Sequence, residues 1–384
     1  MERSIDDYLD RPLGEVRRRE AEAFDEMARP LGTAVVLHGA GRFGRRVSAA
    51  LRGRGVEPLA FSDGNPSLWG QVIDGVGVLS PEDAARALGS RASFVVTIWN
   101  NTHDFISTRA MLLGLGCERV IACPALFYKY PEEFLPYFSM DLPHRIVERR
   151  DRVREAYGLM ADDESRREFL REMQWRMDLD FSGSPPRPMS GQYFPPDLLK
   201  FSGADVFFDC GAFDGDTVTR FLEVTEGSFG KILAFEPDPR NLDALARSVG
   251  ALSSDVQGRV ELHGVAVGAR AERVRFDAEG LSSSGVDPCG AIEVQGTTLD
   301  AFLGRERPTY IKMDIEGAEL DALRGGERLI RESTPALGIC VYHRPEDLWE
   351  IPLFISALSP AYSLHLRRYA EIPWELVCYG IPRS

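Results

Sequence analysis

Little in this sequence suggests a membrane segment, a secretion signal or a nucleic-acid partner. No apolar run among its 384 residues reaches the roughly 18 residues of a membrane-spanning helix. The N-terminal segment MERSIDDYLDRPLGEVRRRE is charged throughout and lacks the apolar core of a signal peptide. The formal net charge of -14 disfavours nucleic acid, because phosphate binding needs a positive surface. We therefore expect a cytoplasmic protein that binds neither a membrane nor nucleic acid.

Cysteine is also sparse. The six cysteines form no CxxC pair, and four of them lie within or beside apolar, strand-like runs. This pattern is typical of buried, reduced thiols and not of a disulfide framework or a zinc site. Apolar and charged contents of 44% and 27% are those of a globular protein. We expect no metal site built on cysteine.

The chain is long enough for two domains. Apolar strand-like runs alternate with helical ones from Thr33 onward and again from Asp205 onward, which predicts parallel sheets with crossover helices. The expected fold class is α/β, with two doubly wound sheets in tandem. The predicted parts are an N-terminal helix (1–30), a first α/β domain (31–130), a helical linker (131–200) and a second α/β domain (201–384).

A glycine motif opens the first α/β domain. In AVVLHGAGRFGRRV, Gly39, Gly41 and Gly44 have GxGxxG spacing between a strand and a helix. Asp63 ends the next strand, where an acid that binds a ribose is expected. We predict that this Rossmann-like domain binds a nucleotide at these four residues. The alternative is a turn kept only for packing or dimerisation.

The continuation SDGNPSLWGQVIDGVGVLSPEDA resembles the N-terminal domains of sugar acyltransferases and related proteins that handle nucleotide sugars. The resemblance covers about residues 33–125 and implies a pocket for a nucleotide sugar. An NAD(P)-binding domain remains an alternative, although no Tyr-xxx-Lys set follows the motif. Asn100, Asn101 and His103, after the strand in SFVVTIWNNTH, either contact the ligand or are ordinary loop residues.

The second domain begins with another glycine-containing turn. In VFFDCGAFDGDTVTRFL, a strand ends at Asp209, and Gly211 and Gly215 lead into a helix that starts near Thr217. Glycine lets the backbone approach a ligand, and an exposed helix start suits a carboxylate. The next strand, KILAFEPDP, ends in Glu236, which can accept both hydroxyls of a ribose. Because DCGAFDGD is not GxGxxG, we favour S-adenosylmethionine (SAM) over a dinucleotide. The alternative is an ordinary tight turn.

Six ordered motifs in this half resemble the FkbM family of SAM-dependent methyltransferases: DVFFDCGAFDGDT, AFEPDP, GVAVG, TTLDAFL, YIKMDIEGAELDALRG and ELVCYGIP. The resemblance covers about residues 192–384. It implies a class I methyltransferase fold and, in most members, O-methylation of natural products and sugars. By position it implies SAM contacts from Asp209, Gly211, Asp214 and Thr217, from Glu236 on the ribose, from the backbone around Ala266 near the adenine, and from Tyr193 as an aromatic cover.

The acceptor side is predicted at the ends of the next two strands. TYIKMDIEGAEL ends in Asp314, with Glu316 two residues later, and ALGICVYHRPEDLWEIP ends in His343. His343 is predicted to remove the proton of an acceptor hydroxyl, because imidazole titrates near neutral pH. Alternatively, Glu316 caps the following helix and His343 pairs with Glu346 or Asp347. These three residues are also able to hold Mg²⁺, but we expect a metal-free site.

The sequence as a whole predicts a SAM-dependent methyltransferase that methylates a hydroxyl of a small-molecule acceptor: a sugar, a nucleotide-linked sugar or another natural product. Two alternatives belong to other classes. One is a non-catalytic module that binds SAM or a nucleotide, and the other is an NAD(P)-binding domain fused to a methyltransferase. The sequence leaves the acceptor and the oligomeric state open, a homo-oligomer included.

Overall fold

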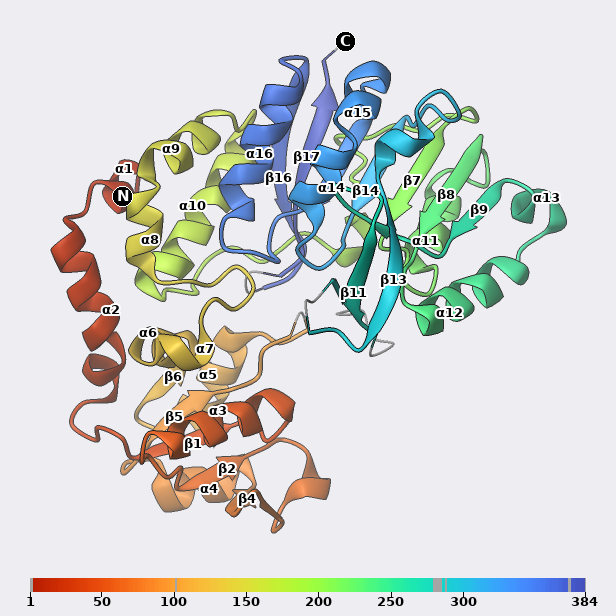
Figure 1. Ribbon diagram of the computed structural model, residues 1–384. Coiled ribbons are helices and arrows are strands. Elements are labelled where there is room, and N and C mark those ends of the chain that lie inside the picture. Colours follow the sequence, from red (N-terminus) through yellow and green to blue (C-terminus); the bar gives the residue numbers. More distant parts are fainter. Residues whose placement is uncertain (1–2, 101, 279–284, 287–288, 372–373, 384) are drawn as a thin grey trace. The chain divides into compact units, whose positions relative to one another are not determined.

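The computed structural model describes residues 3–100, 102–278, 285–286, 289–371 and 374–383. The chain divides into two compact units (Figure 1). Unit 1 consists of Met1–Arg154, Leu170–Pro186 and Ala370–Trp374, and unit 2 consists of Glu155–Phe169, Arg187–Tyr369 and Glu375–Ser384. The segment 131–200, predicted as a linker, is thus divided between the two units.

Unit 1 contains a six-stranded sheet in the order β3-β4-β2-β1-β5-β6. All neighbouring pairs are parallel except the β3–β4 hairpin. The central strand β1 is buried at every residue, as expected where helices cover both faces of a parallel sheet. The strands are β1 (Val35–His38), β2 (Ala60–Ser62), β3 (Val72–Ile73), β4 (Val76–Leu79), β5 (Ser93–Val96) and β6 (Val120–Ala122).

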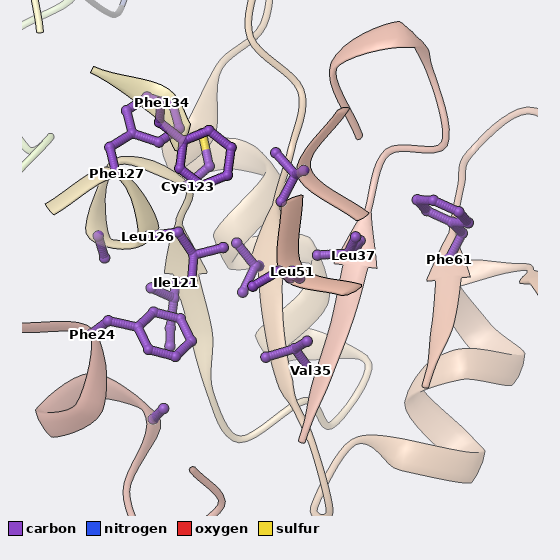
Figure 2. Close-up of a cluster of buried hydrophobic side chains, with 14 of the residues drawn as sticks. Phe24, Val35, Leu37, Leu51, Phe61, Ile121, Cys123, Leu126, Phe127 and Phe134 are labelled. Carbon is purple, nitrogen blue, oxygen red and sulfur yellow. The ribbon is translucent and has the colours of Figure 1, made fainter. Parts of the chain in front are cut away.

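The helix predicted at the N-terminus is α2 (Leu13–Ala28), and it contributes to the core of unit 1. In Figure 2 its Phe24 lies next to Ile121 of β6 and Leu126 of α6. The helices of unit 1 are α1 (Asp6–Leu9), α2, α3 (Arg42–Gly53), α4 (Pro81–Leu88), α5 (Phe105–Gly114), α6 (Pro124–Lys129), α7 (Pro131–Phe134) and α8 (Pro143–Glu148). The unit boundaries fall within α9 (Arg150–Gly158) and α10 (Asp163–Asp178).

The main sheet of unit 2 has seven strands in the order β16-β17-β15-β14-β7-β8-β9. Five strands are parallel, and β17 pairs antiparallel with β15 and β16. The sheet is therefore mostly parallel, as predicted, and it ends in an antiparallel pair. The strands are β7 (Val206–Cys210), β8 (Lys231–Phe235), β9 (Val260–His263), β14 (Tyr310–Met313), β15 (Ala336–Cys340), β16 (Tyr362–Arg368) and β17 (Leu376–Pro382).

A second sheet in unit 2 has the order β10-β13-β11-β12. Its strands are β10 (Ala266–Val267), β11 (Arg273–Asp277), β12 (Gly285–Val286) and β13 (Ile292–Thr297). Figure 1 shows β11 and β13 as a two-stranded ribbon, and their register is antiparallel from Arg273↔Gln295 to Phe276↔Ile292. The helices of unit 2 are α11 (Asp216–Val224), α12 (Pro239–Gly250), α13 (Ser254–Gln257), α14 (Glu319–Gly325), α15 (Glu327–Ser333) and α16 (Asp347–Leu358).

The edge strand β16 is held by Asp162, just before α10, and by Glu168 within α10. Asp162 accepts hydrogen bonds from His365 and Arg367, and Glu168 pairs with Arg368. These polar residues of β16 therefore have structural partners.

Within the described residues, no helix combines the length and the apolar character that a bilayer crossing requires.

Candidate active site

The turn after β7 requires glycine at its first position. Gly211 has φ +82°, and a Cβ there would lie 1.8 Å from the carbonyl oxygen of Asp314. No side chain fits in that space, so the turn packs directly on the backbone that follows β14. Gly215, with φ +93°, is the N-cap of α11. The predicted start of the helix near Asp216 is confirmed, and the turn lies at the carboxyl edge of the sheet.

Glu236 follows β8 and faces this turn. Its two carboxylate oxygens accept backbone hydrogen bonds of 2.9 Å, Oε2 from Phe213 and Oε1 from Asp238. Each oxygen keeps a lone pair for a further donor, as the predicted contact with two ribose hydroxyls requires. Burial raises the pKa of Glu236 to about 7, against the opposing effect of the two backbone N–H groups.

The start of α11 differs from the open helix terminus that the sequence suggested. The Asp216 carboxylate accepts hydrogen bonds from the backbone N–H of Thr217 at 2.6 Å and from its hydroxyl at 3.2 Å. Asp214 in turn accepts the N–H of Asp216 at 3.2 Å. The protein's own acids thus take the place expected for a ligand carboxylate, and Thr217 is buried.

Asp209 lies beneath the turn and not at its surface. It is fully buried, and the Nζ of Lys312 lies 3.1 Å from its Oδ1. Lys312 also donates a 2.6 Å hydrogen bond to the carbonyl oxygen of Gly211. Burial raises the pKa of Asp209 to about 6, although Lys312 opposes this shift. In this structure Lys312 connects Asp209 to the turn, and the predicted contact of Asp209 with SAM stays a prediction.

The sequence reasoning missed Lys312. The β7–β14 register places it directly opposite Asp209. Burial works against its charged form, but Asp209 and Asp314 outweigh that effect and keep the pKa of Lys312 above its usual value. A lysine within the apolar strand TYIKMDI was the available signal, because lysine is almost never fully buried unless it is paired.

Tyr193 is an inner residue of the site. Its side chain is buried, its hydroxyl donates a 2.7 Å hydrogen bond to Oδ2 of Asp314, and its ring lies 5.0 Å from the Nζ of Lys312. The residue has φ +63°, and its backbone N–H donates to the Tyr379 hydroxyl. The structure thus places Tyr193 between the donor turn and Asp314, and not as an outer cover.

Asp314, Glu316 and His343 come together at the ends of β14 and β15. The Nε2 of His343 lies 3.3 Å from Oδ1 of Asp314 and 3.7 Å from Oε1 of Glu316. Its Nδ1 lies 2.8 Å from Oε1 of Glu319. The sequence therefore named three of the four members of this group but missed Glu319. Among the described residues, no hydrogen bond or ion pair joins the ring to Glu346 or Asp347, the suggested alternative partners, and no side chain caps α14.

The charges in this group shift one another. Burial alone would lower the pKa of His343, but Glu319, Glu316 and Asp314 raise it well above 6.5. Burial raises the pKa of Glu316 to about 7, whereas His343 and Lys312 outweigh burial at Asp314 and lower its pKa. The neighbouring acids thus favour the protonated form of the imidazole. It must lose that proton before it can accept one from a hydroxyl.

Ala266, the residue expected near an adenine, opens the second sheet. It is 6% exposed. As the first residue of β10, it pairs with Gly296 of β13. The chain reaches it directly from β9, the outermost strand beside β8. Its backbone therefore follows the strand next to the one that carries Glu236.

The glycine motif of unit 1 forms a second turn of this kind. Gly39 has φ +113°, and a Cβ on Gly44 would lie 1.9 Å from the Gly39 carbonyl oxygen. Gly41 is the N-cap of α3. The Asp63 carboxylate accepts hydrogen bonds from the backbone N–H groups of Ala40 at 2.7 Å and Asn65 at 2.8 Å. The four predicted residues are thus brought together. Of the three loop residues, Asn101 lies outside the described residues.

Comparisons with known proteins match a large part of unit 2 to one family. Residues 209–368 match the model of the methyltransferase FkbM domain. This region is an FkbM methyltransferase domain. The 2-O-methyltransferase NoeI of Sinorhizobium fredii (strain NBRC 101917 / NGR234) is 28% identical, over 41% of this chain and 72% of NoeI. The crystal structure of methyltransferase FkbM from Methylobacillus flagellatus KT shares the fold, with a TM-score of 0.75 and 23% identity over 95% of this chain and 93% of that one.

Proposed function

We propose that the FkbM domain transfers the methyl group of SAM to a hydroxyl oxygen of a small-molecule acceptor. One observation carries the proposal: the turn at Gly211 packs on the backbone of Asp314, where a Cβ would lie 1.8 Å from the carbonyl oxygen. A ligand held by this turn and Glu236 therefore lies beside the Asp314, Glu316 and His343 group. Donor and acceptor positions are adjacent, as a direct transfer requires.

The residues of the turn fit SAM as the donor. Glu236 offers one free lone pair on each carboxylate oxygen for the two ribose hydroxyls, and Gly211 and Gly215 have the positive φ angles of a tight turn. SAM supplies the activated methyl group when it is bound. Lys312 and Asp209 hold the turn from below, because Lys312 bonds the Gly211 carbonyl oxygen and pairs with Asp209.

The acceptor class is proposed to be a sugar, a nucleotide-linked sugar or another natural product with a hydroxyl group. Support comes from the name of the relative NoeI, a 2-O-methyltransferase. Support also comes from the carboxylates and imidazole beside the donor turn, which suit a polar acceptor. The acceptor oxygen would lie beside Asp314 and His343, where its proton can be removed.

Unit 1 is proposed to bind a nucleotide. Its Gly39 turn and Asp63 repeat the arrangement of Gly211 and Glu236, in which an acid after the second strand bonds the glycine turn and a backbone N–H two residues on. Titration of the protein with a nucleotide sugar, NADH or NADPH tests nucleotide binding by unit 1, with Trp fluorescence as the readout. Binding of none of them, or equal binding to the Asp63→Ala variant, would contradict it.

The experiment for the main proposal combines calorimetry with mass spectrometry. SAM should bind the purified protein, and a panel of sugars, nucleotide sugars and phenolic natural products should yield a product heavier by one methylene. Glu236→Gln should weaken SAM binding, whereas Glu261→Gln, an exposed acid on the neighbouring strand β9, should not. SAM binding without product across the panel would favour a non-catalytic module, and no SAM binding would defeat the proposal.

A further inference from the structure

The group Asp314, Glu316 and His343 has the composition of a metal site. Each residue offers one ligand atom, and these atoms all lie within 4.8 Å of one another. Two donors that each lie about 2.0–2.2 Å from a cation, at angles of about 90–110°, are roughly 3.0–3.5 Å apart. The distances of 3.3 Å and 3.7 Å from Nε2 to the two carboxylates are close to this range.

The imidazole of His343 is oriented as a ligand would be. Its Nδ1 is held at 2.8 Å by Glu319, whose Oε1 also accepts the backbone N–H of Ile315. Histidines that bind metals usually donate the N–H of their other nitrogen to such a carboxylate, which fixes the tautomer and the ring. Glu319 is fully buried, so this orientation does not depend on solvent.

The second nitrogen of that ring is a buried atom without a hydrogen bond. The side chain of His343 is 2% exposed, and Nε2 has no hydrogen-bond partner among the described residues. Buried polar atoms are nearly always paired, so one that faces two carboxylates calls for a partner. A cation between them would satisfy Nε2 and both acids together.

The backbone turns Glu316 toward the same point. Glu316 has φ +55° and is followed by Gly317 with φ +93°. A side chain in this left-handed region is uncommon outside functional turns. The turn brings the Glu316 carboxylate to His343, although β14 has ended at Met313.

We propose that Asp314, Glu316 and His343 bind a divalent cation that accepts both carboxylate oxygen and imidazole nitrogen, such as Mn²⁺. Three protein ligands leave open positions on an ion of this kind, which usually takes six. Glu319 is a positioning residue, because it touches only the histidine. This site corresponds to the metal alternative that the sequence left open.

The role of the ion in catalysis rests on the proposed function, but its binding does not. An acceptor hydroxyl on an open position of the ion would lose its proton to water more easily. The oxygen would then form a bond to the methyl carbon while the carbon–sulfur bond breaks. The electron pair of that bond stays on sulfur, which leaves S-adenosylhomocysteine.

The test is titration of the full chain, freed of metal by a chelator, with Mn²⁺ in the absence of SAM and acceptor. Electron paramagnetic resonance of free Mn²⁺ should show one site per chain. His343→Ala and the Asp314→Asn/Glu316→Gln double variant should weaken binding at least about tenfold, and Glu319→Gln about 10–100-fold. Asp321→Asn, an exposed acid on α14 paired with Arg324, is the matched control and should bind as the wild type does.

A pulsed spectrum of the bound Mn²⁺ gives a second readout. The wild-type protein should show nitrogen coupling from a directly bound imidazole, and His343→Ala should lack it. No Mn²⁺ binding at millimolar concentration, or binding that His343→Ala leaves unchanged, would overturn the proposal. Calorimetry with SAM on the same preparations separates the two ideas. Mn²⁺ bound without SAM binding would refute the methyl-transfer proposal and leave the metal site standing.

Discussion

Glu236 should make the affinity for SAM depend on pH near neutrality. Its carboxylate is 5% exposed, and burial raises its pKa to about 7. Asp238 adds to this shift, whereas Lys312 and the backbone N–H groups of Phe213 and Asp238 oppose it. A proton on this acid removes the negative acceptor that two ribose hydroxyls would share. SAM should therefore bind best above pH 7 and progressively less well below it.

The size of the effect follows from the fraction ionised. If only the carboxylate form binds, the apparent Kd is proportional to 1 + 10^(pKa − pH). For a pKa of about 7 this gives about a tenfold rise in Kd from pH 8 to pH 6. Glu236→Gln should raise Kd further, since hydrogen bonds to a charged acceptor contribute about 1.5–3 kcal/mol and neutral ones about 0.5–1.5 kcal/mol. The amide also places its NH₂ group against one of the backbone N–H donors.

Calorimetry at pH 6, 7 and 8 measures both effects. The decisive quantity is the difference between wild type and Glu236→Gln at each pH, because any titration of SAM itself is common to both proteins. The ratio of the two Kd values should shrink as the pH falls, since protonation already removes the charge from the wild type. A ratio that stays constant across this range would refute the assignment of Glu236 to the ribose.

Three further substitutions test residues beneath and beside the turn at Gly211. Lys312→Met removes one partner of a buried ion pair and should lower the free energy of unfolding by about 3–5 kcal/mol. Folding raises the pKa of Asp209, so keeping this buried acid ionised costs more stability as the pH rises. Urea unfolding of Lys312→Met should therefore show a larger loss of unfolding free energy at pH 8 than at pH 5. Gly211→Ala should abolish SAM binding in calorimetry because its Cβ meets the Asp314 carbonyl oxygen, whereas Gly227→Ala, with φ +72° and no atom within 4 Å, should keep it. His343→Ala should lower kcat roughly 10²–10⁴-fold and leave the Kd of SAM nearly unchanged, and normal turnover would remove His343 from the reaction.

Most strands of the two main sheets could be predicted from sequence because they are apolar runs that end in polar residues. The β3–β4 hairpin was missed, although its turn carries a recognisable signal. Asp74 and Gly75 have φ +50° and φ +82°, and an Asp-Gly pair between alternating apolar residues favours a tight hairpin. The predicted alternation of strands and helices did not include this two-residue turn.

The partners within the site were harder to predict than its members. Lys312 pairs with Asp209 only because the register sets them opposite each other on neighbouring strands. Glu319, the first residue of α14, bonds His343, which follows β15, so this pair depends on tertiary packing. Sequence spacing suggested the nearby Glu346 and Asp347 instead. Local patterns thus indicated the residues with polar side chains, but not which of them face one another.

The two units use the same device at the carboxyl edge of their sheets. The strand order β4-β2-β1-β5-β6 of unit 1 corresponds to β9-β8-β7-β14-β15 of unit 2. In both, a glycine turn after the first strand of the unit is bonded by an acid after the second, Asp63 or Glu236.

The units differ at the position directly after the next strand of the sheet. In unit 1 this position is Thr97, whose hydroxyl donates to the carbonyl oxygens of His38 and Gly39 and so closes the turn. In unit 2 it is Asp314, and the turn is closed by Lys312 from within the strand, which leaves Asp314 to face His343. The equivalent residue in unit 1 is thus used for structure, whereas in unit 2 it is available to a ligand. This difference fits the proposal that methyl transfer takes place in unit 2, where Asp314 follows β14 and faces His343.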